Sequence, residues 1–457
     1  MKLRYSFSKL QECELVHEYS IDLLAKTGVS VLSQRVRELL KKRGAIIDGT
    51  KVCMPEHMVR EALETAPSGF VFKTKKHRVA VGNGSSCLVP GYGATNIRRN
   101  GRERLGTRED FLNFTKLIQM SPDMALSCPY ILEPYDLPFE YRNQYKMVMT
   151  LKYSDKPTFS ITQDYETAQQ SIITIKQHFD DFKHYLMIGN INISTPLIVG
   201  EGTAEVILAH CEGDQPLMIS CGSGLSGLTA PPLPAGNLLM SNTGVLAGIV
   251  IAQMLKPGLP VIYGFPLFGV DPYNADASVG SPVSALFTMA AVEMGRYYNL
   301  PVRSGGVFTD ASDLNYQSGF ESFMNLFSSL YSGADCIMQT FGMENALNTL
   351  NYNKFILDEA MYHSVQSYLR GFEINDVTLM KSEIEKIGSD GNYISMGNLR
   401  LIRKQYEPYP YAEKEDQTVM EITEQEIQGR LEHYREPELT EAQKNNLKKI
   451  LPDELMD

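Results

Sequence analysis

The amino-acid sequence predicts an α/β protein: a (β/α)8 TIM barrel with a helical N-terminal segment and a partly helical C-terminal extension. From about residue 107 to residue 341, short apolar segments alternate with amphipathic helical stretches, which is typical of a parallel sheet. Seven candidate strands and an eighth at 86–90 favour a closed barrel, a fold of roughly 250 residues, over an open doubly wound sheet. The alternation stops toward both ends of the 457-residue chain.

Residues 1–70 are predicted to form a helical N-terminal segment. Apolar side chains recur at helical spacing over 9–27 and 33–43. A third helix is expected over 55–66, because its first residue is a proline, which the first turn of a helix favours. From 70 to 105 the chain changes to short, Gly-rich, β-prone pieces. We therefore expect a domain boundary at residue 70.

The barrel domain is expected over 71–375. Besides 86–90, its candidate strands are 124–130, 157–163, 184–193, 216–222, 260–266, 301–307 and 334–341. The helices expected between them are 109–120, 140–152, 165–180, 202–212, 236–256, 282–298 and 316–332. Thr107, followed by Asp110 three residues later, has the pattern of a helix N-cap and predicts where the first of these helices begins.

Residues 376–457 lose the alternation of strands and helices. Helices are expected over 421–434 and 440–450 within this C-terminal extension. Its length and the apolar barrel helices indicate that it packs on the barrel or on a neighbouring subunit. We therefore expect a homo-oligomer.

Composition excludes several classes of protein. The chain has 43 Lys plus Arg against 54 Asp plus Glu, a net charge of −11 with no basic run, so we expect no nucleic-acid partner. The most apolar segment, 244–255, is shorter than the roughly 18 residues of a membrane span, so no membrane association is expected. Seven dispersed cysteines without a CxxC pair indicate reduced thiols in a cytoplasmic protein, and no metal site is predicted.

A glycine-rich stretch at 222–227 has the spacing GxGxxG directly after a predicted strand. A dinucleotide site would need a helix to begin there, with its N-terminus facing the pyrophosphate. Pro231, Pro232 and Pro234 oppose such a helix. The stretch is better interpreted as a loop at the C-terminal end of a barrel strand, where such barrels build their active sites.

Polar and aromatic residues gather on this predicted face, together with two long Gly/Pro-rich loops at 222–235 and 266–282. Any one of them is more simply interpreted as a packing or turn residue, but as a set they favour a substrate-binding site. The candidate substrate-binding residues are Tyr92, Asn190, Asn192, Tyr263, Phe265, Asp310, Gln317, Phe341 and Glu344.

The absence of some catalytic motifs also bears on the chemistry. The sequence has no convincing His–carboxylate or Cys–His arrangement for nucleophilic catalysis, so no catalytic residue is expected beyond residues that position the substrate. With 24 Tyr, 19 Phe and no Trp, a site for an organic cation would use Tyr and Phe ring faces.

Three segments resemble the trimethylamine methyltransferase superfamily. They are the N-terminal HEYSIDLLAKTGV with the helices that follow it, 222–264 with its spacing LTAP…AG…LAGIV…PG.PV.YG, and 333–359. The resemblance covers residues 10–375, and the spacing in the second segment is highly specific. It implies a TIM barrel and a corrinoid-dependent methyl transfer.

The resemblance also implies a branch of the family. Some members carry pyrrolysine, expected near 310–330, where this chain has standard residues only. The non-pyrrolysine branch demethylates quaternary amines such as glycine betaine, proline betaine, carnitine or γ-butyrobetaine. By resemblance, Tyr92, Asn192 and the stretch 341–344 belong to the substrate pocket. After the barrel the family often has a stretch that contains histidine. The corresponding stretch here, 391–399, has no histidine and instead contains Asn392 and Asn398, so the resemblance implies no role for these positions.

The chemistry of a quaternary amine agrees with the residues. Such an amine already bears a positive charge, so its departing tertiary amine needs no general acid. The methyl acceptor would be the Co(I) of a corrinoid (cobalamin) supplied by a separate, cognate corrinoid protein, and no cofactor would be bound tightly by this chain. A substrate carboxylate would need a cationic or backbone N–H partner, for which Arg98, Arg99 and Arg303 are candidates.

Two alternatives stay open. In the first, the chain binds methylated amines without turnover or transfers a methyl group from another donor. In the second, it is an unrelated barrel lyase or aldolase. A Schiff-base aldolase would need a lysine at the C-terminal end of a barrel strand, and none of the seven proposed strands has one.

Overall fold

The computed structural model describes residues 10–455 except 223, 272, 274, 390, 406–409 and 414–415. Two runs of parallel strands form most of a ring. The first run is β9 (Thr158–Phe159), β10 (Met187–Ile193), β12 (Leu217–Cys221) and β13 (Val261–Tyr263), and the second is β16 (Arg303–Gly305), β17 (Cys336–Met338) and β6 (Cys87–Leu88).

Single parallel bridges complete the ring. Tyr263 pairs with Val302 and joins the two runs, while the segment 124–127 bridges to Leu88 on one side and to Thr158 on the other. This segment is the eighth member of the barrel, although it makes only single bridges where the sequence predicts a strand over 124–130. These pairings close the (β/α)8 barrel that the sequence predicts.

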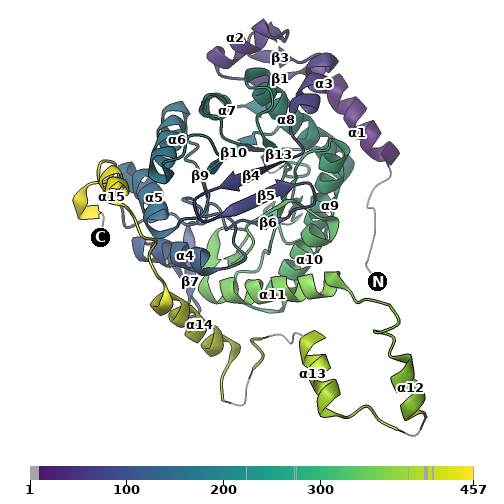
Figure 1. Cartoon of the computed structure of the whole chain (residues 1–457). Coiled ribbons are helices and arrows are strands. Elements are labelled where there is room, and N and C mark those ends of the chain that lie inside the picture. Colours follow the sequence, from purple (N-terminus) through teal and green to yellow (C-terminus); the bar gives the residue numbers. More distant parts are fainter. Residues whose placement is uncertain are drawn as a thin grey trace.

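The helices expected between the strands are present and surround the barrel (Figure 1). They are α4 (Arg108–Met120), α5 (Phe139–Tyr153), α6 (Tyr165–Phe179), α7 (Glu201–Gly213), α8 (Pro234–Leu255), α9 (Pro282–Tyr297) and α10 (Tyr316–Ser332). An eighth barrel helix, α11 (Tyr352–Arg370), was not predicted. The predicted N-cap of α4 is a full capping box between Thr107 and Asp110. Helix α8 is long and apolar enough to cross a membrane, but 83% of its most apolar window is buried inside the protein, as in a core helix.

The N-terminal segment is attached to the outside of the barrel. It consists of α1 (Leu10–Asp22), the π-helical turn η1 (Leu23–Thr27), β1 (Val29–Val31), α2 (Gln34–Lys42), β2 (Ile46–Asp48), β3 (Lys51–Cys53) and α3 (Glu56–Thr65). Strand β1 pairs in parallel with β11 (Ile198–Val199), which lies in the connection after β10. Helices α1 and α3 pack on α8. A side chain at Gly28 would place its Cβ 2.6 Å from the carbonyl oxygen of Val52, so this turn requires glycine.

A β-hairpin closes the N-terminal end of the barrel. Its strands are β4 (Gly69–Lys73) and β5 (Arg78–Gly82), which Figure 1 shows lying across the ring. Phe72 bridges to Tyr185, just before β10, and packs with Phe70 into the apolar cluster of the lumen. The lumen is therefore a packed core at this end rather than a channel.

Two smaller sheets belong to the connections at the other end. Strands β7 (Asn96–Arg99), β8 (Arg102–Leu105), β18 (Met343–Glu344) and β19 (Thr349–Asn351) form one sheet, and β14 (Gly269–Val270) and β15 (Ala277–Ser278) form a hairpin. The hairpin lies within the long loop that the sequence indicates at 266–282.

The C-terminal extension has two parts. Helices α14 (Val419–His433) and α15 (Glu441–Lys448), both expected from the sequence, pack on α11 and α4 and on α6 respectively, and the turn η2 (Asp453–Leu455) follows. Helices α12 (Lys381–Ile387) and α13 (Met396–Gln405), which the sequence analysis did not predict, project away from the barrel (Figure 1).

Candidate functional site

The side chains of the barrel strands divide between the lumen and the helix layer. On β10, Ile188 belongs to the lumen cluster, whereas Ile191 and Ile193 pack in the outer core under the helices. Because side chains alternate along a strand, Asn190 and Asn192 face the lumen above Ile188. Asn190 is buried and Asn192, at the C-terminal end of the strand, is exposed. This end of the lumen is therefore reached by solvent.

Three aromatic rings stand beside these asparagines. Tyr92 lies 4.9 Å from Tyr130 and 5.8 Å from Phe159, measured between ring centroids. They follow or belong to the three barrel segments that precede β10 in the ring: β6, 124–127 and β9. Tyr92 and Tyr130 are half-buried, while Phe159 is part of the buried lumen cluster. We call these three rings the aromatic wall.

The phenols of the aromatic wall are neutral groups. Burial raises the pKa of Tyr92 well above its ordinary value, and burial likewise raises the pKa of Tyr130. The hydroxyl of Tyr130 accepts a hydrogen bond from the backbone N–H of Thr162 at 3.0 Å. The ammonium of Lys146 lies 5.0 Å from the ring centre of Tyr130 and donates to Glu133 at 2.6 Å. The wall can therefore offer a cation its ring faces but no phenolate charge.

Three buried polar atoms of lumen residues have no hydrogen-bond partner within the described chain: Oδ1 of Asn190, Oγ of Ser220 and Nε of Arg303. Ser220 faces the lumen because Met218 does, two residues earlier on β12. Buried polar groups are ordinarily paired, so these three lumen atoms are available to hydrogen-bond a ligand. The lumen beside the aromatic wall is therefore the candidate site.

The connections after β12, β13, β16 and β17 cover the opposite side of this end of the barrel. Phe268, Val279 and Phe308 form a separate apolar cluster there, with Leu225 and Leu347 packed against it. Leu225, in the glycine-rich stretch, belongs to this cover. Its neighbour Gly224 is explained by packing rather than by a nucleotide, because a Cβ there would lie 2.5 Å from the side chain of Asn237.

Asp310 holds this cover in place rather than lining the lumen. Its carboxylate accepts hydrogen bonds from the backbone N–H groups of Val279 at 2.7 Å and Gly280 at 3.2 Å, and from the hydroxyl of Ser278 at 2.9 Å. Burial raises the pKa of this carboxyl group. Gln317 is exposed and donates to Glu321 at 2.9 Å. Neither residue reaches the lumen.

Three other predicted site residues, Tyr263, Phe265 and Phe341, lie in the outer layers. Tyr263 is fully buried under the helices and donates to Asn242 at 2.6 Å, and Phe265 packs against its ring at a centroid distance of 5.7 Å. Phe341 packs on Phe355 of α11 at 5.6 Å. Tyr263 has the strand parity that faces outward, because its neighbour Ile262 belongs to the lumen cluster, and this parity is not known until the register of the barrel is known.

Ion pairs account for two of the three candidate arginines. Arg98 donates to the buried Glu344 at 2.5 Å, and Glu344 also accepts from Asn351 at 3.0 Å, so both groups of this pair are structural. Arg99 pairs with Glu424 of α14 at 2.7 Å and anchors the C-terminal extension. Only the third candidate, Arg303, faces the lumen.

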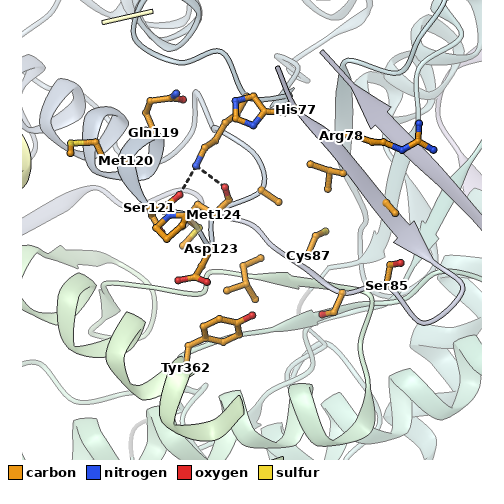
Figure 2. Close-up of a pocket in the computed structure, with 17 residues that line it drawn as sticks. His77, Arg78, Ser85, Cys87, Gln119, Met120, Ser121, Asp123, Met124 and Tyr362 are labelled. Atoms are coloured by element: carbon orange, nitrogen blue, oxygen red, sulfur yellow. Dashed lines mark hydrogen bonds between the residues drawn. The ribbon is translucent and has the colours of Figure 1, made fainter. Parts of the chain in front are cut away.

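A cavity of about 580 Å³ opens at the opposite, N-terminal end of the barrel (Figure 2). The ammonium of Lys156 is buried there and donates to the backbone carbonyls of Ile118, Ser121 and Met124, each at 2.7 Å; the last two bonds are the dashed lines in Figure 2. Its donors are thus satisfied by the protein itself. The cavity is also remote from the C-terminal ends of the strands, where barrel enzymes carry out their chemistry.

Sequence reasoning did not single out Tyr130, Phe159 or Ser220 as site residues. The segment containing Tyr130 reads as a strand end, and Phe159 and Ser220 lie inside predicted strands. The signal in the sequence for Tyr130 is its position at the end of a predicted strand, which it shares with Tyr92. Among the described residues, no group of three or more His, Cys, Asp or Glu side chains is arranged to hold a metal ion.

Comparison with known proteins places the whole chain in one group. Residues 4–452 match the family described as trimethylamine methyltransferase (MTTB). The chain is 31% identical to proline betaine:corrinoid methyltransferase of Eubacterium limosum, over 97% of this chain and 96% of that protein. It is 29% identical to glycine betaine methyltransferase of Desulfitobacterium hafniense, over 88% and 85%. It is 26% identical to L-carnitine:corrinoid methyltransferase of Eubacterium limosum, over 98% and 97%.

Proposed function

Because the chain belongs to the trimethylamine methyltransferase family, we propose that it moves a methyl group from a betaine-type quaternary amine to the Co(I) of a corrinoid protein. The named activities of its relatives on proline betaine, glycine betaine and carnitine support this substrate class. The observation that carries the proposal is the aromatic wall beside the two lumen asparagines. These groups suit a methylated cation and offer no apparatus for proton transfer.

The reaction requires little acid–base chemistry from the protein. The C–N bond breaks with its electron pair left on nitrogen, and the methyl carbon is bonded instead by the electron pair of the Co(I) acceptor. The leaving tertiary amine is neutral and needs no proton at the moment of departure. The protein has to fix the methyl group in line with its acceptor and exclude water.

The aromatic wall performs the first of these tasks in our proposal. The faces of Tyr92 and Phe159 attract the methylammonium through their ring quadrupoles, by up to about 2 kcal/mol per desolvated contact. Lys146 already occupies a position against Tyr130, which leaves the other two rings as the principal contacts. The oxygen of Asn190 that has no partner adds a partial negative charge beside the methyl groups.

We place the methyl acceptor on a separate corrinoid protein, docked over the C-terminal end of the barrel. Asn192 is exposed there and the connections after β12, β13, β16 and β17 lie to the other side, so a bound amine could present a methyl group outward between them. The seven cysteines are all buried and unbridged, which suits the reducing cytoplasm as the place of this reaction.

The test is spectroscopic. Purified protein is mixed with a corrinoid protein reduced to Co(I), and glycine betaine, proline betaine, carnitine, γ-butyrobetaine and trimethylamine are added singly. We expect conversion of the Co(I) absorbance to that of methyl-Co(III) with at least one betaine and none with trimethylamine. The control is a corrinoid protein that is active with another methyltransferase. If no betaine gives conversion with it, the proposal is refuted, and the chain either binds methylated amines without turnover or uses a different methyl donor.

We also propose that the protein is a homo-oligomer, formed through two apolar surfaces. The first is a stripe of aromatic residues along α10 at helical spacing: Tyr316, Phe320, Phe323, Phe327 and Tyr331. The second is an arm formed by residues 371–403, which contains α12 and most of α13. Within the described part of the arm no residue is buried, although it carries apolar side chains such as Ile394, which is 87% exposed.

Exposed apolar surface of this extent is unusual in a monomer and typical of an interface. The stripe and the arm are continuous, because Phe327 packs on Tyr368 of α11, at 5.8 Å, just before the arm begins. Barrel helices run opposite to the strands, so α11 ends at the N-terminal end of the barrel, away from the end proposed for the corrinoid protein. We therefore propose a second copy of the chain, rather than the corrinoid protein, as the partner of both surfaces.

A further inference from the structure

Arg303 is a buried cation at an unusual place, inside the barrel. Val302 and Ile337 pack in the outer core, whereas Cys336 and Met338, on the strand paired with β16, belong to the lumen cluster. By alternation Arg303 faces the lumen, where it is only 4% exposed. A guanidinium with five N–H donors is thus surrounded by mostly apolar side chains.

The protein itself does not satisfy this guanidinium. Nη2 of Arg303 donates to the sulfur of Met338 at 3.3 Å, a weak acceptor, and Nε has no partner. Among the described residues no carboxylate forms an ion pair with it, in contrast to Arg98 and Arg99. Burial lowers the pKa of Arg303 to about 10, so the group is still charged at neutral pH. Buried charges are rarely left unpaired, because removal from water is costly.

The side chain passes over Gly264 and reaches Met338, which pairs with Gly305, two residues beyond Arg303. Its Cγ and Cδ lie 2.9 and 3.2 Å from the position that a Cβ on Gly264 would take. Gly264 follows β13 at its C-terminal end, so the absence of a side chain there makes room for the arginine stem. Ser220 lies on β12, which only β13 separates from β16, and it holds a buried hydroxyl that has no partner and can donate to an anion.

We infer that Arg303 binds the carboxylate of the substrate, so that the enzyme selects zwitterionic quaternary amines over quaternary amines without an acidic group. This inference rests on the proposed function and names the chemical class of substrate for the same site. A planar guanidinium pairs with a carboxylate through two parallel hydrogen bonds, which also fixes orientation. Arg303 is thus a specificity-determining residue.

The arrangement also orients the substrate. Arg303 and Ser220 lie on β16 and β12, whereas Tyr92 and Phe159, the principal contacts proposed for the ammonium, lie after β6 and on β9. Strand β9 is four places from β16 in the eight-membered ring, so Phe159 lies on the far side of the lumen from Arg303. A substrate with its carboxylate on Arg303 therefore spans the lumen and places its ammonium against the aromatic wall.

The test compares carboxylate and amide forms of one substrate. The betaine that gives the largest response is assayed beside its uncharged amide, a close isostere, with wild-type protein, Arg303→Met and Arg303→Lys. We expect the wild type to prefer the carboxylate by about 100-fold in kcat/KM. Arg303→Met should lose this preference through a higher KM for the carboxylate, with kcat for the amide retained, and Arg303→Lys should restore part of it.

The matched control is Arg296→Met, the same change at a half-exposed arginine of α9, which should leave the preference unchanged. Binding of the same two ligands to the protein without a corrinoid partner is measured by calorimetry. We expect Arg303→Met to lose affinity for the carboxylate only. Equal preference in Arg303→Met and wild type, by kinetics or by calorimetry, would overturn the inference while the methyl transfer stands.

Two further outcomes separate this inference from the proposed function. If wild-type protein transfers no methyl group but binds the carboxylate about 100-fold tighter than the amide, the proposed methyl transfer is refuted and the proposed carboxylate site at Arg303 is supported. If Arg303→Met does not fold, the wild-type comparison decides alone, and an equal response to carboxylate and amide overturns the inference. Removal of an unpaired buried charge is expected to leave the melting temperature without ligand unchanged or higher.

Discussion

At the scale of single residues, the proposed site has neutral rings where a charged group would be counterproductive. The positive charge of a quaternary ammonium disappears as the tertiary amine leaves, so a carboxylate or phenolate beside it would stabilise the bound substrate more than the transition state. Burial holds the pKa of Tyr92 well above its ordinary value and thereby keeps the phenol neutral. Ring faces provide a weaker attraction that also accommodates methyl groups.

The ring of Tyr92, rather than its hydroxyl, should therefore determine activity. We expect Tyr92→Leu to lower kcat/KM for the betaine substrate by roughly 30-fold, the equivalent of one cation–π contact of about 2 kcal/mol. Tyr92→Phe, the matched control, keeps the ring and should stay within about threefold of wild type. The methyl-Co(III) assay measures both. Equal losses in the two variants would show that the hydroxyl matters and not the ring face.

At the scale of elements, α7 is joined to the barrel through a buried histidine. His210 is completely buried, its Nδ1 lies 3.2 Å from the carbonyl oxygen of Gln215, and its Nε2 lies 2.8 Å from the hydroxyl of Ser160. The carbonyl can only accept, so Nδ1 carries the proton and Nε2 accepts from Ser160. The ring lies against the backbone of Gly189, where a Cβ would come within 2.5 Å of it. The helix and the two strands are thus fitted around a neutral imidazole.

This histidine should make folding stability depend on acid pH. Burial lowers the pKa of His210 to about 4, whereas an unfolded histidine titrates near 6.5. Between pH 6.5 and 4 the unfolded chain therefore binds a proton that the folded chain does not, and the free energy of unfolding falls as pH falls. The loss through this window should be on the order of 3 kcal/mol from this group.

Denaturant unfolding of wild type and His210→Gln between pH 7 and pH 4 measures the effect. We expect the variant to be less stable at pH 7, because the fit against Gly189 is lost, but to depend less steeply on pH. His57→Gln, at an exposed histidine, is the control and should follow the wild-type curve. A slope unchanged by His210→Gln would mean that other groups cause the acid destabilisation.

At the scale of the whole molecule, the barrel and the N-terminal segment bury their apolar side chains within one chain, but the arm does not. Helix α12 has no buried residue, and seven residues are too few for an isolated helix to be stable in water. Helices α14 and α15, which follow the arm, return to the barrel and bury Ile427 and Leu447. The chain therefore extends outward and comes back, as expected for a segment that embraces another subunit.

Mass measurement tests this assembly. We expect size-exclusion chromatography with light scattering to give a multiple of the 51.2 kDa chain, and a double change, Phe320→Ser with Phe323→Ser, to shift the mass toward the monomer. Both rings are about half exposed in the single chain, at 53% and 47%, so folding should survive. The control is Ile46→Ser, which is 62% exposed on the N-terminal segment. A wild-type monomer, or an unchanged mass in the double variant, would contradict the proposal.

The barrel could be predicted from the sequence because its signals are local. Apolar runs, helical periodicity and the cap at Thr107 are each read within a few residues, and their order along the chain implies the topology. The family could be recognised for the same reason, since the segment at 222–264 is contiguous. The sequence predicts Tyr92, Asn190 and Asn192 as site residues because they lie near strand ends, and the structure brings all three to the lumen.

The sequence by itself determined the fold class, the family and the kind of chemistry. The tertiary structure decided which residues share the lumen and so the proposed site, because lumen and helix layer differ only by the parity of a strand position, and parity is defined by register across the closed ring. By this parity Asn190 faces the lumen, whereas Tyr263 faces the helix layer. It also distinguished Arg303 from Arg98 and Arg99, since a missing counter-charge is a property of the space around a side chain and has no trace in the order of residues.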